Sequence, residues 1–194
     1  RPGRLYAVMG PSGCGKTTFL SALSNKIHGG GRVLGDTYVN GSKMDKATGI
    51  GNFNKVIGFV PQEDTMLREL STKQNIQYAS RLQNSGSKHS SDVVNAILRV
   101  LDIYRVKHVN IGDEHVRGIS GGQRKRVNVA MELAGDPSMI LLDEPTSGLD
   151  SGSSLELIKT LSTLAKERGI TIAMVIHQPV SILSFVLFLC SPLP

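Results

Sequence analysis

The sequence predicts an α/β fold with a mainly parallel sheet, and two observations support this prediction. First, short runs of apolar residues alternate along the chain with longer segments of helical periodicity. Second, these runs are apolar at nearly every position, as in 139–142 (MILL), whereas a strand with one face in water would alternate apolar and polar residues. Such strands are buried on both faces, so we expect helices to cover both sides of the sheet.

The elements of the N-terminal half follow from apolar runs and from the residues that end them. An apolar strand at Leu5–Met9 ends at a glycine-rich loop, and helical periodicity begins after this loop at about Thr18. Short strands are expected at Thr37–Val39 and at 56–60. The second of these ends at Pro61, because proline cannot donate a hydrogen bond to a neighbouring strand.

Helices and strands alternate through the rest of the chain. Two helices, at about 72–82 and 92–101, are separated by the polar stretch 84–91, which we interpret as a mobile surface connection. The later elements are a helix at about 122–133, a strand at Met139–Leu142, a helix at about 153–166 and a strand at Thr171–Ile176. There is no internal repeat, and 194 residues are enough for one domain with a sizeable core.

Composition and charge restrict the class of protein only loosely. A net charge of +6 would suit a polyanionic partner, but we expect most of the basic residues to lie on a solvated surface. Cys14 and Cys190 are the two cysteines, and their separation and unlike surroundings predict a reducing compartment and no disulfide. The apolar stretch 181–190 is shorter than the ~20 residues of a membrane-spanning helix, so no such helix is expected.

The glycine-rich loop predicts a phosphate-binding site. Residues 10–17 (GPSGCGKT) match the pattern of a glycine, four residues and Gly-Lys-Thr, and they lie between a strand and a helix. Such a loop wraps its backbone N–H groups around an anion, and the helix N-terminus adds a favourable dipole. The alternative is a glycine-rich turn with an incidental lysine, which this context disfavours. The predicted nucleotide-binding residues of the loop are Gly10, Pro11, Ser12, Gly13, Cys14, Gly15, Lys16, Thr17 and Thr18.

Two acidic residues predict a metal site and a catalytic base. Asp143 and Glu144 follow an apolar strand, at the place where open α/β sheets bind their ligands. Asp143 and the Thr17 hydroxyl would hold Mg²⁺, while Lys16 would reach the β- and γ-phosphates. Glu144 would polarise the attacking water. The alternative is a solvated turn that merely ends the strand, and the phosphate-binding loop upstream disfavours it.

A third motif leads to a resemblance with a known family. Residues 119–123 (ISGGQ) differ at one position from the Leu-Ser-Gly-Gly-Gln signature of ABC ATPases. Small residues after a serine N-cap also begin many ordinary helices, so the order of the motifs has to decide. Gln62 falls where the family has its Q-loop glutamine, residues 147–150 match its D-loop, and His177 matches its switch histidine. With the motifs in the family order, the chain resembles an ABC transporter ATP-binding cassette.

The resemblance covers about residues 5–179 and can be narrowed to a subfamily. The runs 116–126, 142–151 and 175–179 resemble the G subfamily, the White-type half-transporters of eukaryotes. The resemblance implies a P-loop NTPase fold with an α-helical subdomain, at about 65–135, that carries the signature motif. It also implies that residues 1–194 form a single, truncated nucleotide-binding domain that lacks the transmembrane domain.

The same resemblance implies ATP hydrolysis that powers transport across a membrane, with ATP and Mg²⁺ as cofactors. Two nucleotide-binding domains, identical or related, would close head to tail, and each ATP site would need both chains. The transmembrane domain of the parent transporter would be a second partner, with the cassette on the cytosolic face of the membrane and no nucleic acid bound. The implied catalytic residues are Glu144, His177 and Gln62, and the implied metal ligands are Thr17, Gln62 and Asp143. Further implied nucleotide-binding residues are Ser120, Gly121, Gly122, Gln123 and Asp150, of which Ser120 and Gly122 would face the ATP held by the other chain.

Two features depart from the family pattern. The chain begins after the strands that help to hold the adenine, and residues 180–194 are an apolar tail where the family continues through a helix with an acidic residue into further strands. We interpret the tail as a truncation or an aberrant chain end, which leaves a catalytically inactive cassette as one alternative function. Another alternative is a soluble ABC ATPase that acts on nucleic acid or ribosomes, although the compact motif spacing disfavours the DNA-repair type. Residues 124–126 (RKR) lack interleaved aromatics and are expected on a solvated face.

Overall fold

The computed structural model describes residues 1–24, 26, 34–35, 37–39, 42–44, 56–83, 91–113 and 116–176. Several expectations fall outside these residues, namely the surface connection at 84–90, His177, Cys190 and the tail at 180–194. Cys14 is an exposed free thiol. In the described part of the chain, no helix combines the length and the apolar character that crossing a membrane requires.

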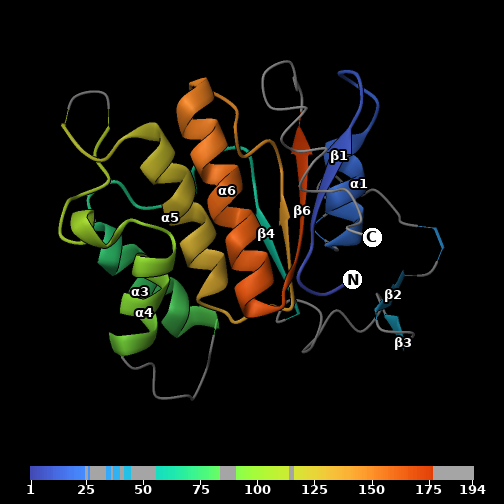
Figure 1. The fold of residues 1–194 in the computed structure, drawn as a ribbon, viewed down its shortest axis with the longest axis horizontal. Coiled ribbons are helices and arrows are strands. Elements are labelled where there is room, and N and C mark those ends of the chain that lie inside the picture. The colour runs from blue at the N-terminus through green and yellow to red at the C-terminus, as the bar shows by residue number, and fades with distance from the viewer. Residues whose placement is uncertain are drawn as a thin grey trace.

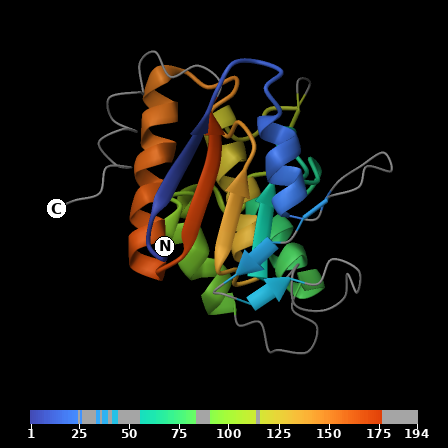
Figure 2. The ribbon, with the colours of Figure 1, turned by 90° about the vertical axis from the view of Figure 1, so that its right-hand side faces the viewer.

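A four-stranded parallel sheet forms the centre of the molecule. Its strands lie in the order β1 (Leu5–Met9), β6 (Thr171–Ile176), β5 (Met139–Leu142) and β4 (Ile57–Val60), and each neighbouring pair is parallel. Figure 2 shows the four strands side by side. The prediction of an α/β fold with a mainly parallel sheet is therefore confirmed. Because the strands run the same way, the loops that leave their carboxyl ends gather along one edge of the sheet.

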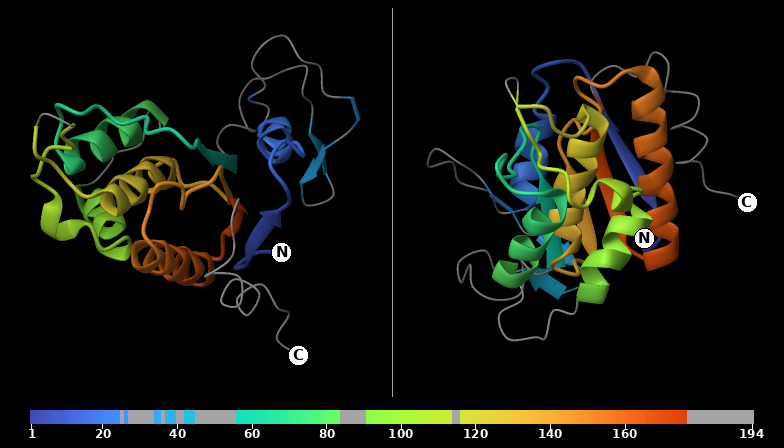
Figure 3. Two further views of the ribbon diagram at one scale, coloured as in Figure 1. Left: turned by 90° about the horizontal axis from the view of Figure 1, so that it is seen from above. Right: turned by 90° about the vertical axis from the view of Figure 1, so that its left-hand side faces the viewer.

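Helices cover both faces of this sheet, as the apolar strands predicted. Helix α1 (Lys16–Leu23) lies on one side, while α5 (Gly121–Leu133) and α6 (Ser151–Arg168) lie on the other (Figure 3). The alternation of side chains along β5 explains this arrangement, because Leu141 packs in the cluster that contains Leu20 of α1, whereas the flanking residues face the other helices. Strand β5 therefore contributes side chains to both buried clusters, one on each face of the sheet.

A further group of helices packs on the outer side of α5. It consists of α3 (Thr72–Gln83), α4 (Ser91–Val100) and a short 3-10 helix at Tyr104–Val106 (Figure 1). These elements lie within the predicted helical subdomain, but they do not have a separate core. Ile76 of α3 and Leu98 of α4 belong to the same buried cluster as Ile140 of β5. Helix α5 contacts α3, α4, α6 and β4, so it lies between the outer helices and the sheet.

The structure differs from the sequence prediction mainly at element ends. Helix α1 begins at Lys16, two residues before the predicted start, because Gly15 adopts a left-handed backbone (φ 88°) and forms its N-cap. Helix α6 also begins two residues early, since the Asp150 carboxylate accepts a hydrogen bond from the Ser153 N–H. A second small sheet pairs β2 (Thr37–Val39) with β3 (Ser42–Met44), and β3 was not predicted because its polar residues give no apolar run.

The chain passes close to itself at Gly112 and Gly118, and this crossing positions the start of α5. A side chain at Gly118 would place its Cβ atom 1.9 Å from the carbonyl oxygen of Ile111, so only glycine fits there. The crossing is closed by a hydrogen bond of 3.2 Å from the Ile119 N–H to the Ile111 carbonyl. Ile119 is buried, and the next residue, Ser120, begins the helix. The glycine crossing therefore fixes where the signature motif enters α5.

Candidate active site

The predicted phosphate-binding loop, Gln62, Asp143 and Glu144 all lie at the carboxyl edge of the parallel sheet. The glycine-rich loop follows β1, Gln62 follows β4 by two residues, and Asp143 follows β5 directly. This edge is where open α/β sheets bind ligands. His177 follows the last described residue of β6 and lies outside the described residues, so its role stays a prediction.

Lys16 occupies the centre of the glycine-rich loop. Its Nζ atom donates hydrogen bonds of 2.9 Å to the carbonyl oxygens of both Gly10 and Pro11, and the residue is only 8% exposed. The loop can curl around this ammonium group because Gly13 and Gly15 have left-handed backbone angles (φ 76° and 88°) that favour glycine. The first backbone N–H groups of α1, which begins at Lys16, have no acceptor within their helix. Loop and helix together form a positively polarised cradle.

Thr17 and Asp143 form a pair of hard oxygen ligands next to this cradle. The Thr17 hydroxyl donates a hydrogen bond of 3.0 Å to Asp143 Oδ1, which joins the start of α1 to the end of β5. Asp143 is 4% exposed, and its backbone N–H donates to the Val60 carbonyl of β4 at 2.9 Å. Among the described residues, no group of three or more His, Cys, Asp or Glu side chains could hold a metal. Two oxygens fit Mg²⁺, which usually completes its octahedron with water and substrate phosphates.

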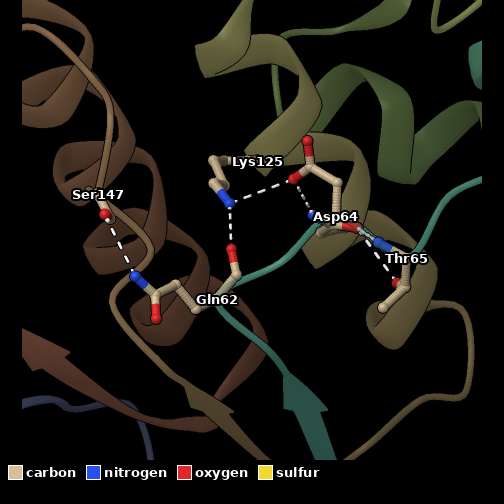
Figure 4. Close-up of polar contacts among 6 residues, drawn as sticks. Gln62, Asp64, Thr65, Lys125 and Ser147 are labelled. Atoms are coloured by element: carbon tan, nitrogen blue, oxygen red, sulfur yellow. Dashed lines mark hydrogen bonds and ion pairs between the residues drawn. The ribbon is translucent and has the colours of Figure 1, made fainter. Parts of the chain in front are cut away.

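Gln62 and Glu144 meet at the same edge. The Gln62 amide donates a hydrogen bond of 3.2 Å to Glu144 Oε2. It also lies 3.5 Å from the Ser147 hydroxyl, a contact that Figure 4 marks with a dashed line. Glu144 has a left-handed backbone (φ 46°), which is uncommon for a residue with a side chain and recurs at functional sites. No separate role was predicted for Ser147, since a serine in a loop carries no signal of its own. Its position shows that the segment 147–150 reaches the Gln62 side chain.

The signature motif forms the N-terminus of α5 and has a local structural role. The Ser120 hydroxyl accepts a hydrogen bond of 3.3 Å from the Gln123 N–H, and the Gln123 side chain accepts one of 3.0 Å from the Ser120 N–H. This reciprocal pair is a capping box, which satisfies two backbone donors at a helix start. The start of α5 is therefore stabilised from within the chain, and its remaining N–H groups provide a dipole that favours an anion.

The starts of α5 and α6 lie against each other. A methyl group placed on Gly121 would lie 3.4 Å from the Leu149 side chain, and one on Gly122 would lie 3.5 Å from Ser153. Asp150 caps α6, and its hydrogen bonds with Ser153 hold the pKa of its carboxyl below the usual range. The structure thus separates the predicted residues into two groups. One surrounds Lys16, and the other, at the start of α5, lies on the opposite side of the sheet from α1 (Figure 3).

The expectation of a solvated face at 124–126 is wrong, because Arg126 is buried and both Arg124 and Lys125 are only partly exposed. The side chains of Lys125 and Arg126 are only 12% and 11% exposed. Arg126 donates a hydrogen bond of 3.2 Å to Glu156 of α6 and lies 3.7 Å from the Asp102 carboxylate. The reason for the difference is tertiary packing, because α5 lies between other elements and its basic side chains extend along their surfaces.

Glu132 is a carboxylate in the last turn of α5 that faces β4. It accepts a hydrogen bond of 3.2 Å from the Phe59 N–H. Burial raises the pKa of Glu132 above its usual value, while the charge of Lys26 and the bond from Phe59 oppose this shift. The strand leaves room for the carboxylate because residue 58 is glycine, whose added Cβ would lie 3.3 Å from Glu132. This carboxylate therefore ties α5 to β4 near the candidate site.

We expect Glu132→Gln to stabilise the protein at neutral pH more than at acid pH. The pKa of Glu132 is higher in the folded than in the unfolded chain. The stability that Glu132 contributes to the fold is therefore fully present below the unfolded pKa and is lost as the pH rises through the folded pKa. Glutamine keeps an acceptor for Phe59 and does not titrate. Urea unfolding of both proteins between about pH 4 and pH 8 measures the difference, which should grow with pH. A difference that is independent of pH would contradict the assignment.

Comparisons with known proteins give a consistent result. The family described as ABC transporter matches residues 1–147. ABC transporter G family member 28 of Arabidopsis thaliana is 45% identical over 92% of this chain and 16% of its own length, and ABC-type transporter claG of Penicillium crustosum is 38% identical over 92% and 23%. A solved ATP-binding cassette, a dimer in a post-hydrolysis state with ADP and Pi, is 26% identical with a TM-score of 0.70, over 93% of this chain and 78% of that chain. This chain spans between 16% and 28% of the length of the curated relatives.

Proposed function

Because the chain belongs to the ABC transporter family, we propose that it binds and hydrolyses ATP with Mg²⁺ and that this reaction drives a substrate across a membrane. The observation that carries the proposal is the meeting of three kinds of group at one sheet edge. These are the Lys16 ammonium in its loop, the Thr17–Asp143 oxygen pair, and the Glu144 carboxylate in contact with Gln62. Each group matches one need of in-line attack on a γ-phosphate.

The glycine-rich loop binds the phosphates of ATP in this proposal. Lys16 is already held by two carbonyl oxygens, so its charge is positioned before the nucleotide arrives and costs little reorganisation. The backbone N–H groups from Gly13 to Thr18 surround the anion, with the dipole of α1 behind them. This arrangement supplies binding and charge stabilisation without covalent chemistry, as phosphoryl transfer requires.

The Thr17 hydroxyl and the Asp143 carboxylate hold Mg²⁺, and Gln62 is a further candidate ligand through its side-chain oxygen. When bound, Mg²⁺ neutralises charge on the β- and γ-phosphate oxygens. Glu144 follows Asp143 directly at the end of β5 and so lies at the same sheet edge. In the proposal this carboxylate orients the attacking water and accepts its proton. Gln62 holds Glu144 in place through the hydrogen bond between their side chains. His177 would act on the γ-phosphate from the end of β6.

A second nucleotide-binding domain completes each site in the proposal. The capped start of α5 offers N–H groups to an anion, yet it lies across the sheet from α1 of the same chain. Ser120, Gly121 and Gly122 can therefore meet an ATP held by another chain. The related ATP-binding cassette that was solved as a dimer supports this arrangement.

We also propose that the cassette is attached to a transmembrane domain and lies on the cytosolic face of a membrane. The support comes from the relatives, which are described as ABC transporters and are several times longer than this chain. No specific observation favours the alternatives of a ribosome-bound or nucleic-acid-bound ATPase. The side chains of Lys125 and Arg126, which would have formed the basic face for such a partner, instead contact carboxylates within the chain and are only 12% and 11% exposed.

Replacing Lys16 with alanine should weaken ATP binding about tenfold to hundredfold, because hydrogen bonds to a charged group are worth roughly 1.5–3 kcal/mol and each 1.4 kcal/mol is tenfold in affinity. Titration with Mg-ATP, followed by fluorescence of a labelled nucleotide, measures the affinity. Lys166→Ala is the matched control, because Lys166 is an exposed residue near the opposite end of α6 from Asp150. Parental affinity in Lys16→Ala would refute the cradle.

A further inference from the structure

We propose that Lys125 of the signature helix is a positioning residue that sets where Gln62 presents its amide to Glu144. The inference rests on the proposed function, in which Glu144 is the base and Gln62 holds it. Lys125 is not one of the predicted site residues, and the inference assigns it a positioning role. Lys125 does not touch Glu144, so its effect on the reaction passes through Gln62.

Two contacts of Lys125 carry the proposal. Its Nζ atom donates a hydrogen bond to the main-chain carbonyl oxygen of Gln62 and lies 3.2 Å from Oδ1 of Asp64 (Figure 4). The Lys125 side chain is 12% exposed and that of Asp64 is 34% exposed, so the pair is partly shielded from water. The lysine thus binds the loop at the very residue whose side chain contacts Glu144.

Asn128, one turn further along α5, strengthens the same attachment. Its amide donates a hydrogen bond of 2.9 Å to Asp64 Oδ1, the oxygen that also faces Lys125. Its side-chain oxygen accepts a hydrogen bond of 3.3 Å from the Thr65 N–H. We call Lys125, Asp64 and Asn128 the clasp. Because residues 125 and 128 are three apart on a helix, they lie on one face and both meet the loop.

The clasp joins the loop to the helix that carries the signature motif. Glu132, on the same face of α5, accepts a hydrogen bond from Phe59, so residues 59–65 are attached to α5 at several points. A shift of α5 must therefore move the backbone of Gln62. The amide of Gln62 then approaches or leaves Glu144, which is positioned separately at the end of β5.

The energies of the contacts favour a positioning role over a merely stabilising one. A partly exposed ion pair such as Lys125–Asp64 adds little to the stability of a fold. In contrast, a catalytic group that is misplaced by about 1 Å can cost a hundredfold in rate. Loss of the clasp should therefore lower kcat much more than it lowers the stability of the fold.

The first experiment measures ATP turnover by the full-length protein that carries this cassette. Lys125→Met, which removes the charge and keeps most of the stem, should lower kcat about tenfold and leave KM for ATP within about twofold of the parent. Lys125→Arg, which retains a cation and donors, should recover most of the rate. Lys166→Met is the matched control and should have the parental kcat. A Lys125→Met protein with the parental kcat would overturn the proposal.

A double-mutant cycle tests whether Lys125 acts through Gln62. Gln62→Ala alone should lower kcat, and adding Lys125→Met to it should lower kcat no further, because the side chain that the clasp positions is already gone. A purely structural lysine would instead cost the same factor in both backgrounds. That second result, or a parental kcat in Gln62→Ala, would overturn the inference.

Amide hydrogen exchange gives a readout that does not depend on catalysis. Exchange in a peptide that covers 62–66 should be about tenfold faster in Lys125→Met than in the parent and in Lys166→Met, because the attachment of this loop to α5 is weakened. Unchanged exchange would overturn the clasp even if turnover fell. The proposed function is contradicted by a different result, namely ATP hydrolysis at the parental rate by Glu144→Gln. In that case the exchange experiment still tests the clasp, because it does not depend on catalysis.

Discussion

Glu144→Gln should reduce ATP turnover about a thousandfold, because a general base contributes roughly 10²- to 10⁴-fold to a proton transfer. Glutamine keeps the shape of the side chain and can still contact Gln62, but it cannot accept the proton of the attacking water. ATP binding should remain, since the phosphates are held by the loop around Lys16. With hydrolysis blocked, the two cassettes should stay closed on ATP. Phosphate release and sedimentation with Mg-ATP measure the two effects.

The matched control for this variant is Glu167→Gln, which makes the same change at an exposed position of α6. It should hydrolyse ATP at the parental rate. If Glu144→Gln also retains the parental rate, then Glu144 is not the base, and the reading of its contact with Gln62 as catalytic is wrong.

Gly122→Asp should abolish dimer formation on ATP and leave ATP binding by the single cassette nearly unchanged. The substitution places a carboxylate at the N-terminus of α5, where the proposal has the γ-phosphate of the opposing ATP, and like charges there repel. The fold should tolerate the new side chain, because a Cβ atom on Gly122 would lie 3.5 Å from Ser153, an ordinary contact distance. Sedimentation in a Glu144→Gln background, with and without Mg-ATP, measures the effect.

Gly122→Asn is the control that separates charge from size. Asparagine has nearly the shape of aspartate and no charge, so this variant should dimerise better on ATP than Gly122→Asp. If Gly122→Asp dimerises as well as the parent in the same background, the site is not shared between two chains, and the proposed mechanism fails.

The elements that could be predicted from the sequence are those with a local signal. The strand Met139–Leu142 is apolar throughout and was predicted with its observed bounds. The glycine-rich pattern before Lys16 indicated a loop between a strand and a helix, and the structure has this loop between β1 and α1. The strand Ser42–Met44 has no such signal, because it is short and polar and depends on pairing with β2. Helix starts were misplaced where a cap decides them, as Asp150 does for α6.

The contacts within the candidate site were harder to predict, because they join residues far apart in the chain. Gln62 and Glu144 are separated by 82 positions, and Lys125 and Asp64 by 61. Motif order indicated that Gln62 and Glu144 belong to one site, but it could not indicate that their side chains touch. For Lys125 it gave no indication, and a run of three basic residues suggested exposure. Only the packing of α5 against the sheet shows that this lysine points inward.

The packing of Gly121 and Gly122 against Leu149 and Ser153 has a consequence for how two ATP molecules influence each other. In the proposed pair, the start of α5 meets the nucleotide of the opposing chain, while the loop that leads into α6 begins beside Glu144, which serves the chain's own nucleotide. The contact between the starts of α5 and α6 thus lies between the two proposed ATP sites. Thermodynamic linkage makes such a connection reciprocal: whatever factor the first nucleotide applies to the affinity for the second, the second applies to the first. We therefore expect that, in the proposed pair, binding of one ATP changes the affinity for the other.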